Sequence, residues 1–168
     1  DLFVQQARQR PEQIAASCAG ESMTYAALEE RARSFAAALR RRGLPPQAVV
    51  AIQLESPLEV VAAMLGVMQF GGIFLCLEGD APLHRRESIL RDANAAALIA
   101  RRASFARLPL PGLVCIDASD AVEIDREPVQ PAAMSPRQPA YMVYTSGSTG
   151  APKGVLGAQE GILLYLDQ

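Results

Sequence analysis

Residues 48–54 are the segment that most limits how this chain can fold. They read Ala-Val-Val-Ala-Ile-Gln-Leu, an apolar run with one polar break. Such a run is typical of a strand that is covered on both faces, as the strands of a parallel sheet are. Pro57 then stands at a first-turn position that tolerates the loss of an N–H group, and Val60–Met68 is apolar on nearly every side. The sequence therefore predicts a buried strand and a deeply buried helix, which Gly71 and Gly72 end.

The same alternation continues on both sides of this unit. Upstream, Leu2–Gln9 reads as a short amphipathic helix, Gln13–Cys18 and Ser22–Thr24 read as short strands, and Thr24 caps a helix that runs to about Arg42. Downstream, we expect one helix at 83–93, an exposed connection at 117–139, and strands at 73–77, 96–100, 113–117 and 140–144. Alternating elements with short connections predict an α/β fold with a mostly parallel sheet flanked by helices.

The charge balance excludes several functions. The net charge is −2 over 168 residues, and the concentrated cations Arg40, Arg41 and Arg42 fall where the long helix should end and its macrodipole favours them. The sequence has no basic block of the kind that a nucleic-acid surface needs. Its longest apolar run is too short to cross a bilayer and lacks the flanks of a secretion signal. We therefore expect a cytoplasmic protein that binds neither nucleic acid nor membrane.

Cysteine and histidine give no sign of a metal centre. Cys18, Cys76 and Cys115 have neither metal-ligand spacing nor a disulfide pattern, so they read as small buried apolar residues in a reducing compartment. His84, the single histidine, has no companion for a His-based metal site or a catalytic triad. No metal ligand is therefore assigned within residues 1–168.

The two ends of the chain suggest a fragment. The sequence begins at Asp1 without an initiator methionine and stops at Gln168, just after the apolar, helix-like run Ile162–Leu166, without a capping or stop signal. We expect residues 1–168 to be one piece of a larger protein, truncated at both ends.

Residues 145–154 carry the strongest functional signal, because they follow the last expected strand and combine glycines, hydroxyls and a lysine. Gly147, Gly150 and Gly154 permit positive φ and a close approach of a ligand to the backbone. Successive N–H groups of such a loop can form a nest for anionic oxygens, and Lys153 can reach the same oxygens. Pro152 limits the ordering cost. The segment therefore suits a polyphosphate, with further donors from the hydroxyls of Thr145, Ser146, Ser148 and Thr149.

Three other interpretations of this segment fit less well. A flexible Gly/Ser surface loop would not require the preceding strand or the following Pro152-Lys153-Gly154. The P-loop of nucleotide triphosphatases requires Gly-Lys followed directly by Ser or Thr, whereas Lys153 here precedes Gly154. The dinucleotide fingerprint Gly-x-Gly-x-x-Gly does not occur.

Ala140–Tyr144 followed by Thr145–Val155 resembles the phosphate-loop signature of the adenylate-forming (AMP-binding) superfamily, most closely that of the adenylation domains of non-ribosomal peptide synthetases. Met23–Ala32 resembles the family's early helix-start motif, and Met64–Asp80 resembles its Lys-Ala-Gly-x-Tyr-Leu segment. The loop is a strong signal. The other two also fit plain buried helices and strands, so their joint order carries the argument. The resemblance covers essentially the whole chain and implies an incomplete N-terminal subdomain of the adenylate-forming fold.

The resemblance implies a reaction in two halves. A carboxylate attacks the α-phosphate of Mg-ATP to give an acyl-adenylate and pyrophosphate, and the acyl group then passes to a thiol, here the phosphopantetheine of a carrier-protein domain. Residues 145–153 would hold the β- and γ-phosphates, and Lys153 would help to neutralise charge on the departing pyrophosphate. The substrate pocket, the Mg²⁺ ligand and the catalytic lysine of the C-terminal domain would lie beyond Gln168. We therefore expect the fragment alone to be inactive.

The chain also departs from the family pattern. Leu77–Asp80 replaces a Pro-Leu-Asp-Pro-like turn, Gln69 replaces a lysine, Phe70 holds a position that is basic or aromatic in the family, and Ala158-Gln159 stands where a histidine is common. An acyl- or aryl-CoA ligase is therefore a close alternative, since its loop is very similar. A non-catalytic adenylation-like scaffold that holds neighbouring domains is the alternative from another class.

Overall fold

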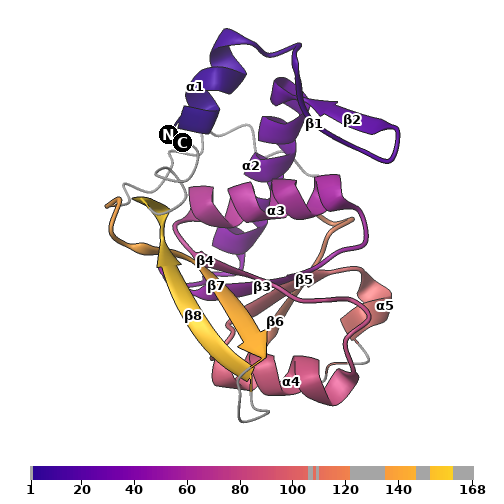
Figure 1. Ribbon diagram of the computed structural model, residues 1–168, viewed down its shortest axis with the longest axis vertical. Coiled ribbons are helices and arrows are strands. Elements are labelled where there is room, and N and C mark those ends of the chain that lie inside the picture. The colour runs from indigo at the N-terminus through magenta and orange to yellow at the C-terminus, as the bar shows by residue number, and fades with distance from the viewer. Residues whose placement is uncertain (1, 106–107, 109, 122–134, 147–151, 161–168) are drawn as a thin grey trace.

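A six-stranded sheet forms the centre of the molecule in this computed structural model, which describes residues 2–105, 108, 110–121, 135–146 and 152–160. Its strands are β3 (Val49–Gln53), β4 (Ile73–Cys76), β5 (Ala97–Ala100), β6 (Val114–Asp117), β7 (Pro139–Ser146) and β8 (Pro152–Ala158). They lie in the order β6-β5-β3-β4-β7-β8, and every neighbouring pair is parallel except β7 and β8 (Figure 1). The predicted α/β fold with a mostly parallel sheet is confirmed.

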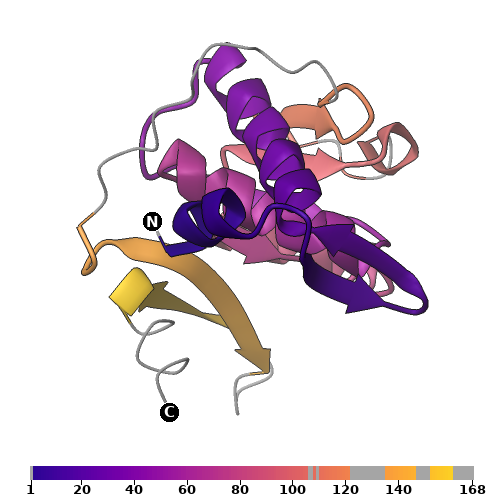
Figure 2. The same cartoon turned by 90° about the horizontal axis from the view of Figure 1, so that it is seen from above.

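Helices cover both faces of the sheet. On one face lie α2 (Tyr25–Arg41) and α3 (Pro57–Phe70), and on the other lies α4 (Leu83–Asp92), with the short α5 (Arg102–Phe105) beside it (Figures 1 and 2). Alternate residues of β3 follow this division, since Val50 and Ile52 belong to the core under α2 and α3, whereas Ala51 belongs to the core under α4. An apolar run without a polar face was therefore the correct signature of a doubly covered strand.

The N-terminal elements pack beyond α2. They are α1 (Leu2–Gln9) and an antiparallel pair of strands, β1 (Ile14–Cys18) and β2 (Glu21–Thr24). Thr24 caps α2 as expected, because its hydroxyl accepts a hydrogen bond from the N–H of Ala27 at 3.2 Å. Arg40 and Arg41 lie in the last turn of α2, as the macrodipole argument predicted.

Close packing joins α2 to α3. Gly66 of α3 faces Ala32 and Phe35 of α2, and a Cβ atom at position 66 would lie 2.6 Å from the carbonyl oxygen of Ala32 and 2.7 Å from Cβ of Phe35. Ala32 and Phe35 are fully buried. The absence of a side chain at Gly66 therefore allows the two helices to approach.

Two elements of the structure, and the burial of the cysteines, differ from the sequence-based expectation. Strand β8 and the short α5 were not predicted. The cysteines were expected to be buried, but Cys76 is exposed, Cys18 and Cys115 are half-buried, and all three are free thiols. Cys76 is the last residue of β4 and Cys18 ends a strand of the small hairpin, so both lie where the chain leaves its sheet. Residues 162–166 lie outside the described part of the chain.

No helix within the described residues is long and apolar enough to span a bilayer.

Candidate functional site

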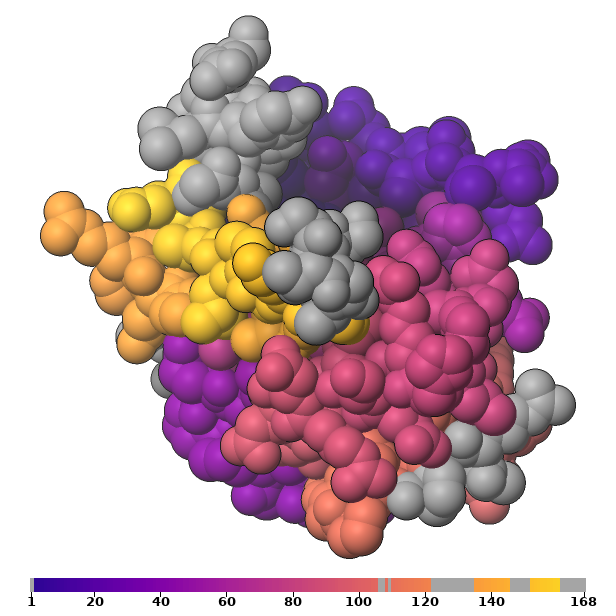
Figure 3. Space-filling model, turned by 60° about the horizontal axis from the view of Figure 1, so that its bottom comes forward, coloured from indigo at the N-terminus to yellow at the C-terminus, as the bar shows by residue number. Residues whose placement is uncertain are grey.

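The segment that the sequence singled out lies at the end of a β-hairpin. Strands β7 and β8 pair antiparallel, with Thr145 opposite Lys153 and Ser146 opposite Pro152. Since β7 runs parallel to β4, this end of the hairpin lies at the carboxyl edge of the sheet. Open α/β sheets bind their ligands at that edge. Figure 3 shows the hairpin beside α4 on one face of the molecule.

The hairpin corrects part of the loop prediction. Thr145 and Ser146 belong to β7, and Lys153 and Gly154 belong to β8, although all four were expected in an irregular loop. The strands extend further because the two arms pair with each other, a contact that local sequence does not reveal. Gly147, Ser148, Thr149 and Gly150, the remaining predicted phosphate contacts, lie outside the described residues. Thr145 and Lys153 are both exposed at the end of the hairpin.

Gly154 does not have the positive φ that the sequence suggested, and its contact with phosphate stays a prediction. A left-handed backbone conformation therefore does not explain the glycine at this position. The ring of Tyr144 lies across it, and a Cβ atom at Gly154 would be 3.0 Å from Cζ of Tyr144, so the ring would have to move by a few tenths of an ångström to admit a side chain. Tyr141 and Gly157 repeat this arrangement three residues further along the hairpin, where a Cβ atom would meet the ring of Tyr141. Aromatic side chains thus cover two cross-strand glycines.

Tyr144 also connects the hairpin to α4. Its phenol donates a hydrogen bond to Oδ2 of Asp92, the last residue of α4, at 2.5 Å. Partial burial and this bond raise the pKa of Tyr144, so the phenol remains a donor at neutral pH. Sequence reasoning missed this contact because Asp92 and Tyr144 are far apart in the chain.

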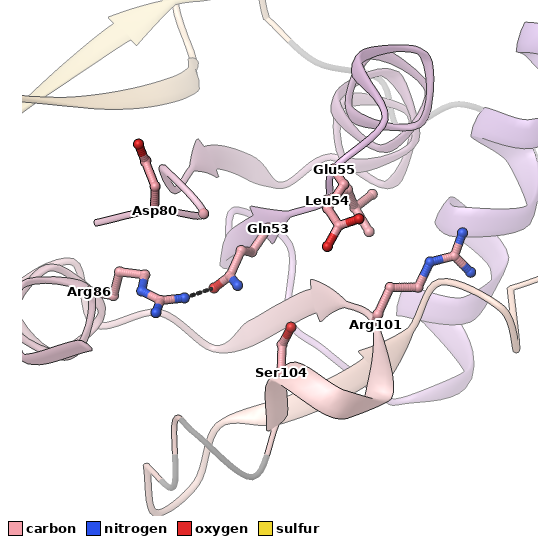
Figure 4. Close-up of a pocket in the computed structure, with 8 residues that line it drawn as sticks. Gln53, Leu54, Glu55, Asp80, Arg86, Arg101 and Ser104 are labelled. Atoms are coloured by element: carbon pink, nitrogen blue, oxygen red, sulfur yellow. Dashed lines mark hydrogen bonds between the residues drawn. The ribbon is translucent and has the colours of Figure 1, made fainter. Parts of the chain in front are cut away.

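A cavity of about 470 Å³ opens at the same edge of the sheet (Figure 4). Two of its lining residues are Gln53, the last residue of β3, and Arg86 of α4. Nη1 of Arg86 donates a hydrogen bond to Oε1 of Gln53 at 3.0 Å. Ser104 of α5 points toward the cavity, whereas the side chain of Arg101 extends away from Gln53. The connections of β3 and β5 leave toward opposite sides here, which makes this a topological switch point. Gln53 is the one polar break in the apolar run, a signal that could have identified the cavity.

A second cluster of polar side chains lies at the carboxyl end of β6. The N–H and the hydroxyl of Ser119 both donate to Oδ1 of Asp117, and Nε of Arg102 donates to Oδ2 at 3.1 Å. These hydrogen bonds, those from Ser119 foremost, hold the pKa of Asp117 at about 2. The cluster ties α5 to the end of the sheet.

Within the described residues, no group of three or more His, Cys, Asp or Glu side chains could hold a metal ion. Gln69, which stands where the resembled family has a lysine, is 4% exposed and lies in the last turn of α3. Among the predicted phosphate contacts, Thr145 and Lys153 are exposed and lie opposite each other at the carboxyl edge.

Comparison with known proteins gives consistent results. A family model described as AMP-binding enzyme matches residues 3–166. The dimodular nonribosomal peptide synthase of Bacillus subtilis (strain 168) is 37% identical over 99% of this chain, and tyrocidine synthase 3 of Brevibacillus parabrevis is 34% identical over 96%. These matches span only 7% and 3% of the two synthases, so this chain corresponds to a small part of their length.

Solved structures agree in fold. The N-terminal subdomain of NpsA from Klebsiella oxytoca, in complex with 3-hydroxybenzoyl-AMSN, aligns with a TM-score of 0.84 and 27% identity over 96% of this chain and 41% of that one. O-succinylbenzoate coenzyme A synthetase (MenE) from Bacillus subtilis, in complex with AMP, aligns with a TM-score of 0.87 and 24% identity over 98% of this chain and 44% of that one.

Proposed function

This chain belongs to the family of AMP-binding enzymes, and from that premise we propose that residues 1–168 are the N-terminal portion of an adenylation domain in a non-ribosomal peptide synthetase. The complete domain activates an amino acid or a related carboxylic acid as acyl-AMP and passes it to the thiol of a carrier-protein phosphopantetheine. The observation that carries this proposal is the exposed Thr145–Lys153 pair at the carboxyl edge of a parallel sheet, in a chain whose curated relatives are peptide synthases.

The chemistry required of this chain is binding and charge neutralisation. The hydroxyls of Thr145, Ser146, Ser148 and Thr149, together with the amides around Gly147 and Gly150, hold the β- and γ-phosphates of ATP. Lys153 neutralises negative charge that develops on pyrophosphate as the substrate carboxylate attacks the α-phosphate, and Gly154 keeps the strand close to the Tyr144 ring. Such fixed donors accelerate a reaction because they need not reorganise as charge moves. Lys153 is therefore an electrostatic partner and not a nucleophile.

Bound Mg²⁺ would add charge neutralisation on the phosphates, and its ligands would come from outside residues 1–168. The synthetase would act in the cytoplasm, where ATP, neighbouring synthetase domains and the carrier-protein domain meet.

The direct test is ATP–pyrophosphate exchange by the complete adenylation domain, scored over a panel of amino and aryl acids. We expect exchange with one acid or a small related group. A coenzyme A ligase would instead release a coenzyme A thioester without needing a carrier domain. A scaffold would show neither exchange nor heat of Mg-ATP binding in a calorimetric titration, and that pair of results would refute the proposed activity.

A further inference from the structure

The functional end of the hairpin extends past the sheet that supports it. Strand β7 pairs with β4 at Tyr141 and Met142, but β7 continues to Ser146. Residues 143–146 therefore lie beyond this pairing. On the other side, β8 occupies the edge of the sheet and pairs with β7. The strand ends that carry Thr145 and Lys153 consequently need support from outside the β4 ladder.

Tyr144 provides such support from the body of the protein. Its ring packs against the core cluster under α4, and its phenol donates to Oδ2 of Asp92 at 2.5 Å. Asp92 ends α4, a helix whose Ile89 and Leu90 are buried in that same core. The hydrogen bond therefore connects the extended part of β7 to a firmly packed helix.

The same side chain controls the distance to β8. Tyr144 lies directly opposite Gly154, and its Cζ and hydroxyl would be 3.0 and 3.1 Å from a Cβ atom at that position. The next pair along the hairpin is Thr145 and Lys153. Asp92, Tyr144 and Gly154 thus form a continuous series of contacts from α4 to the strand that carries Lys153.

We propose that Asp92 and Tyr144 are a positioning pair, which holds the end of the β7–β8 hairpin against α4 and so determines where Thr145 and Lys153 meet the triphosphate. This inference rests on the proposed function of the hairpin. In this role the pair acts through Thr145 and Lys153 and does not itself bind the nucleotide. Its effect is on alignment, and an error of about 1 Å in the placement of binding groups can cost on the order of 100-fold in rate.

The experiment uses Tyr144→Phe in the complete adenylation domain, which removes the phenol but keeps the ring over Gly154. We expect the KM for Mg-ATP in pyrophosphate exchange to rise about 5- to 30-fold, the ratio that corresponds to the loss of a charge-assisted hydrogen bond. The KM for the acid should stay the same. Asp92→Ala should match Tyr144→Phe, whereas Asp92→Asn should fall between the parent and Tyr144→Phe, because its amide oxygen still accepts the bond but carries no charge.

Tyr141→Phe is the matched control, since Tyr141 lies on the same strand and covers Gly157 in the same way but stacks on Phe74 on the opposite core. It should leave the KM for Mg-ATP unchanged. The double variant Asp92→Ala with Tyr144→Phe should be no worse than either single variant, because both remove one interaction. Equal KM values for Tyr144→Phe and Tyr141→Phe, in a parent that exchanges pyrophosphate, would overturn the positioning role alone. A parent that does not bind Mg-ATP would overturn the proposed function, and this inference with it.

Discussion

Arg31 of α2 and Glu59 of α3 form a bidentate ion pair, in which Nε donates to Oε1 at 2.9 Å and Nη2 donates to Oε2 at 2.5 Å. Both side chains are 16% exposed. Arg31 also donates to the carbonyl oxygens of Ala118 and Ala121, and its guanidinium lies 4.3 Å from the ring centroid of Phe35. One side chain thus joins two helices to the turn after β6.

Replacement of Glu59 should therefore destabilise the fold. In Glu59→Gln the guanidinium of Arg31 remains largely buried without its counter-charge, and we expect a loss of about 1–3 kcal/mol in the free energy of unfolding. Urea denaturation measures this. The control is Glu29→Gln, since Glu29 and Arg33 form a longer, more exposed i,i+4 pair at 3.8 Å and should contribute less than about 0.5 kcal/mol. Equal losses in the two variants would contradict the role of Arg31.

The variant Gly66→Ala should change stability through two opposing effects, helix propensity and packing. Alanine is favoured over glycine inside a helix by roughly 0.5–1 kcal/mol. The new Cβ would lie 2.6 Å from the backbone oxygen of Ala32, so α2 and α3 must separate, at a cost of typically about 1–3 kcal/mol. We expect packing to dominate and the melting temperature to fall. Gly79→Ala is the control, because a Cβ atom at position 79 would meet no described residue within 4 Å. A rise in melting temperature for Gly66→Ala would refute this account.

Asp117 should make the stability depend on acid pH. Its pKa is about 2 in the folded protein against an ordinary 3.8, mainly because Ser119 donates two hydrogen bonds to the carboxylate. A depressed folded pKa stabilises the protein above the unfolded value, and that contribution disappears as the pH falls from about 4 toward 2. We expect this contribution of Asp117 to be about 1–2 kcal/mol. It is smaller than the full pKa shift would give, because the partner Arg102 is exposed and solvent screens their attraction.

The measurement is the free energy of unfolding of the parent and of Asp117→Asn at several pH values. Their difference should shrink as the pH falls through this window. Asp120→Asn is the matched control, since it removes the more exposed carboxylate that Arg102 also contacts. A difference that is constant from pH 5 to pH 2 would show that Asp117 does not titrate in this way.

Lys153→Ala tests the phosphate contact itself. Removal of one charge-assisted contact should weaken pyrophosphate exchange by the complete domain by about 1–3 kcal/mol, with no change in melting temperature, because Lys153 is exposed. Arg8→Ala is the control, since it removes an exposed cation from α1 instead. Unchanged exchange in Lys153→Ala would exclude Lys153 from the functional residues.

Local signals were sufficient for most of the secondary structure. The apolar run at 48–54, the cap at Thr24 and the glycine that ends α3 each act within a few residues, so their effects can be read in order along the chain. The phosphate-loop motif likewise identified the family from contiguous residues, as the match over residues 3–166 confirms. The assignment of individual phosphate contacts remains a prediction.

Contacts between distant segments could not be predicted in this way. Strand β8 exists because it pairs with β7, Gly154 lies under the ring of Tyr144 because of the same pairing, and Asp92 meets that tyrosine only after α4 packs on the sheet. The sequence by itself thus determined the α/β alternation and the family, and it predicts the class of ligand that the 145–154 segment suits. The tertiary structure alone decided which side chains meet at the carboxyl edge, because strand order and helix packing bring together residues that no local pattern connects.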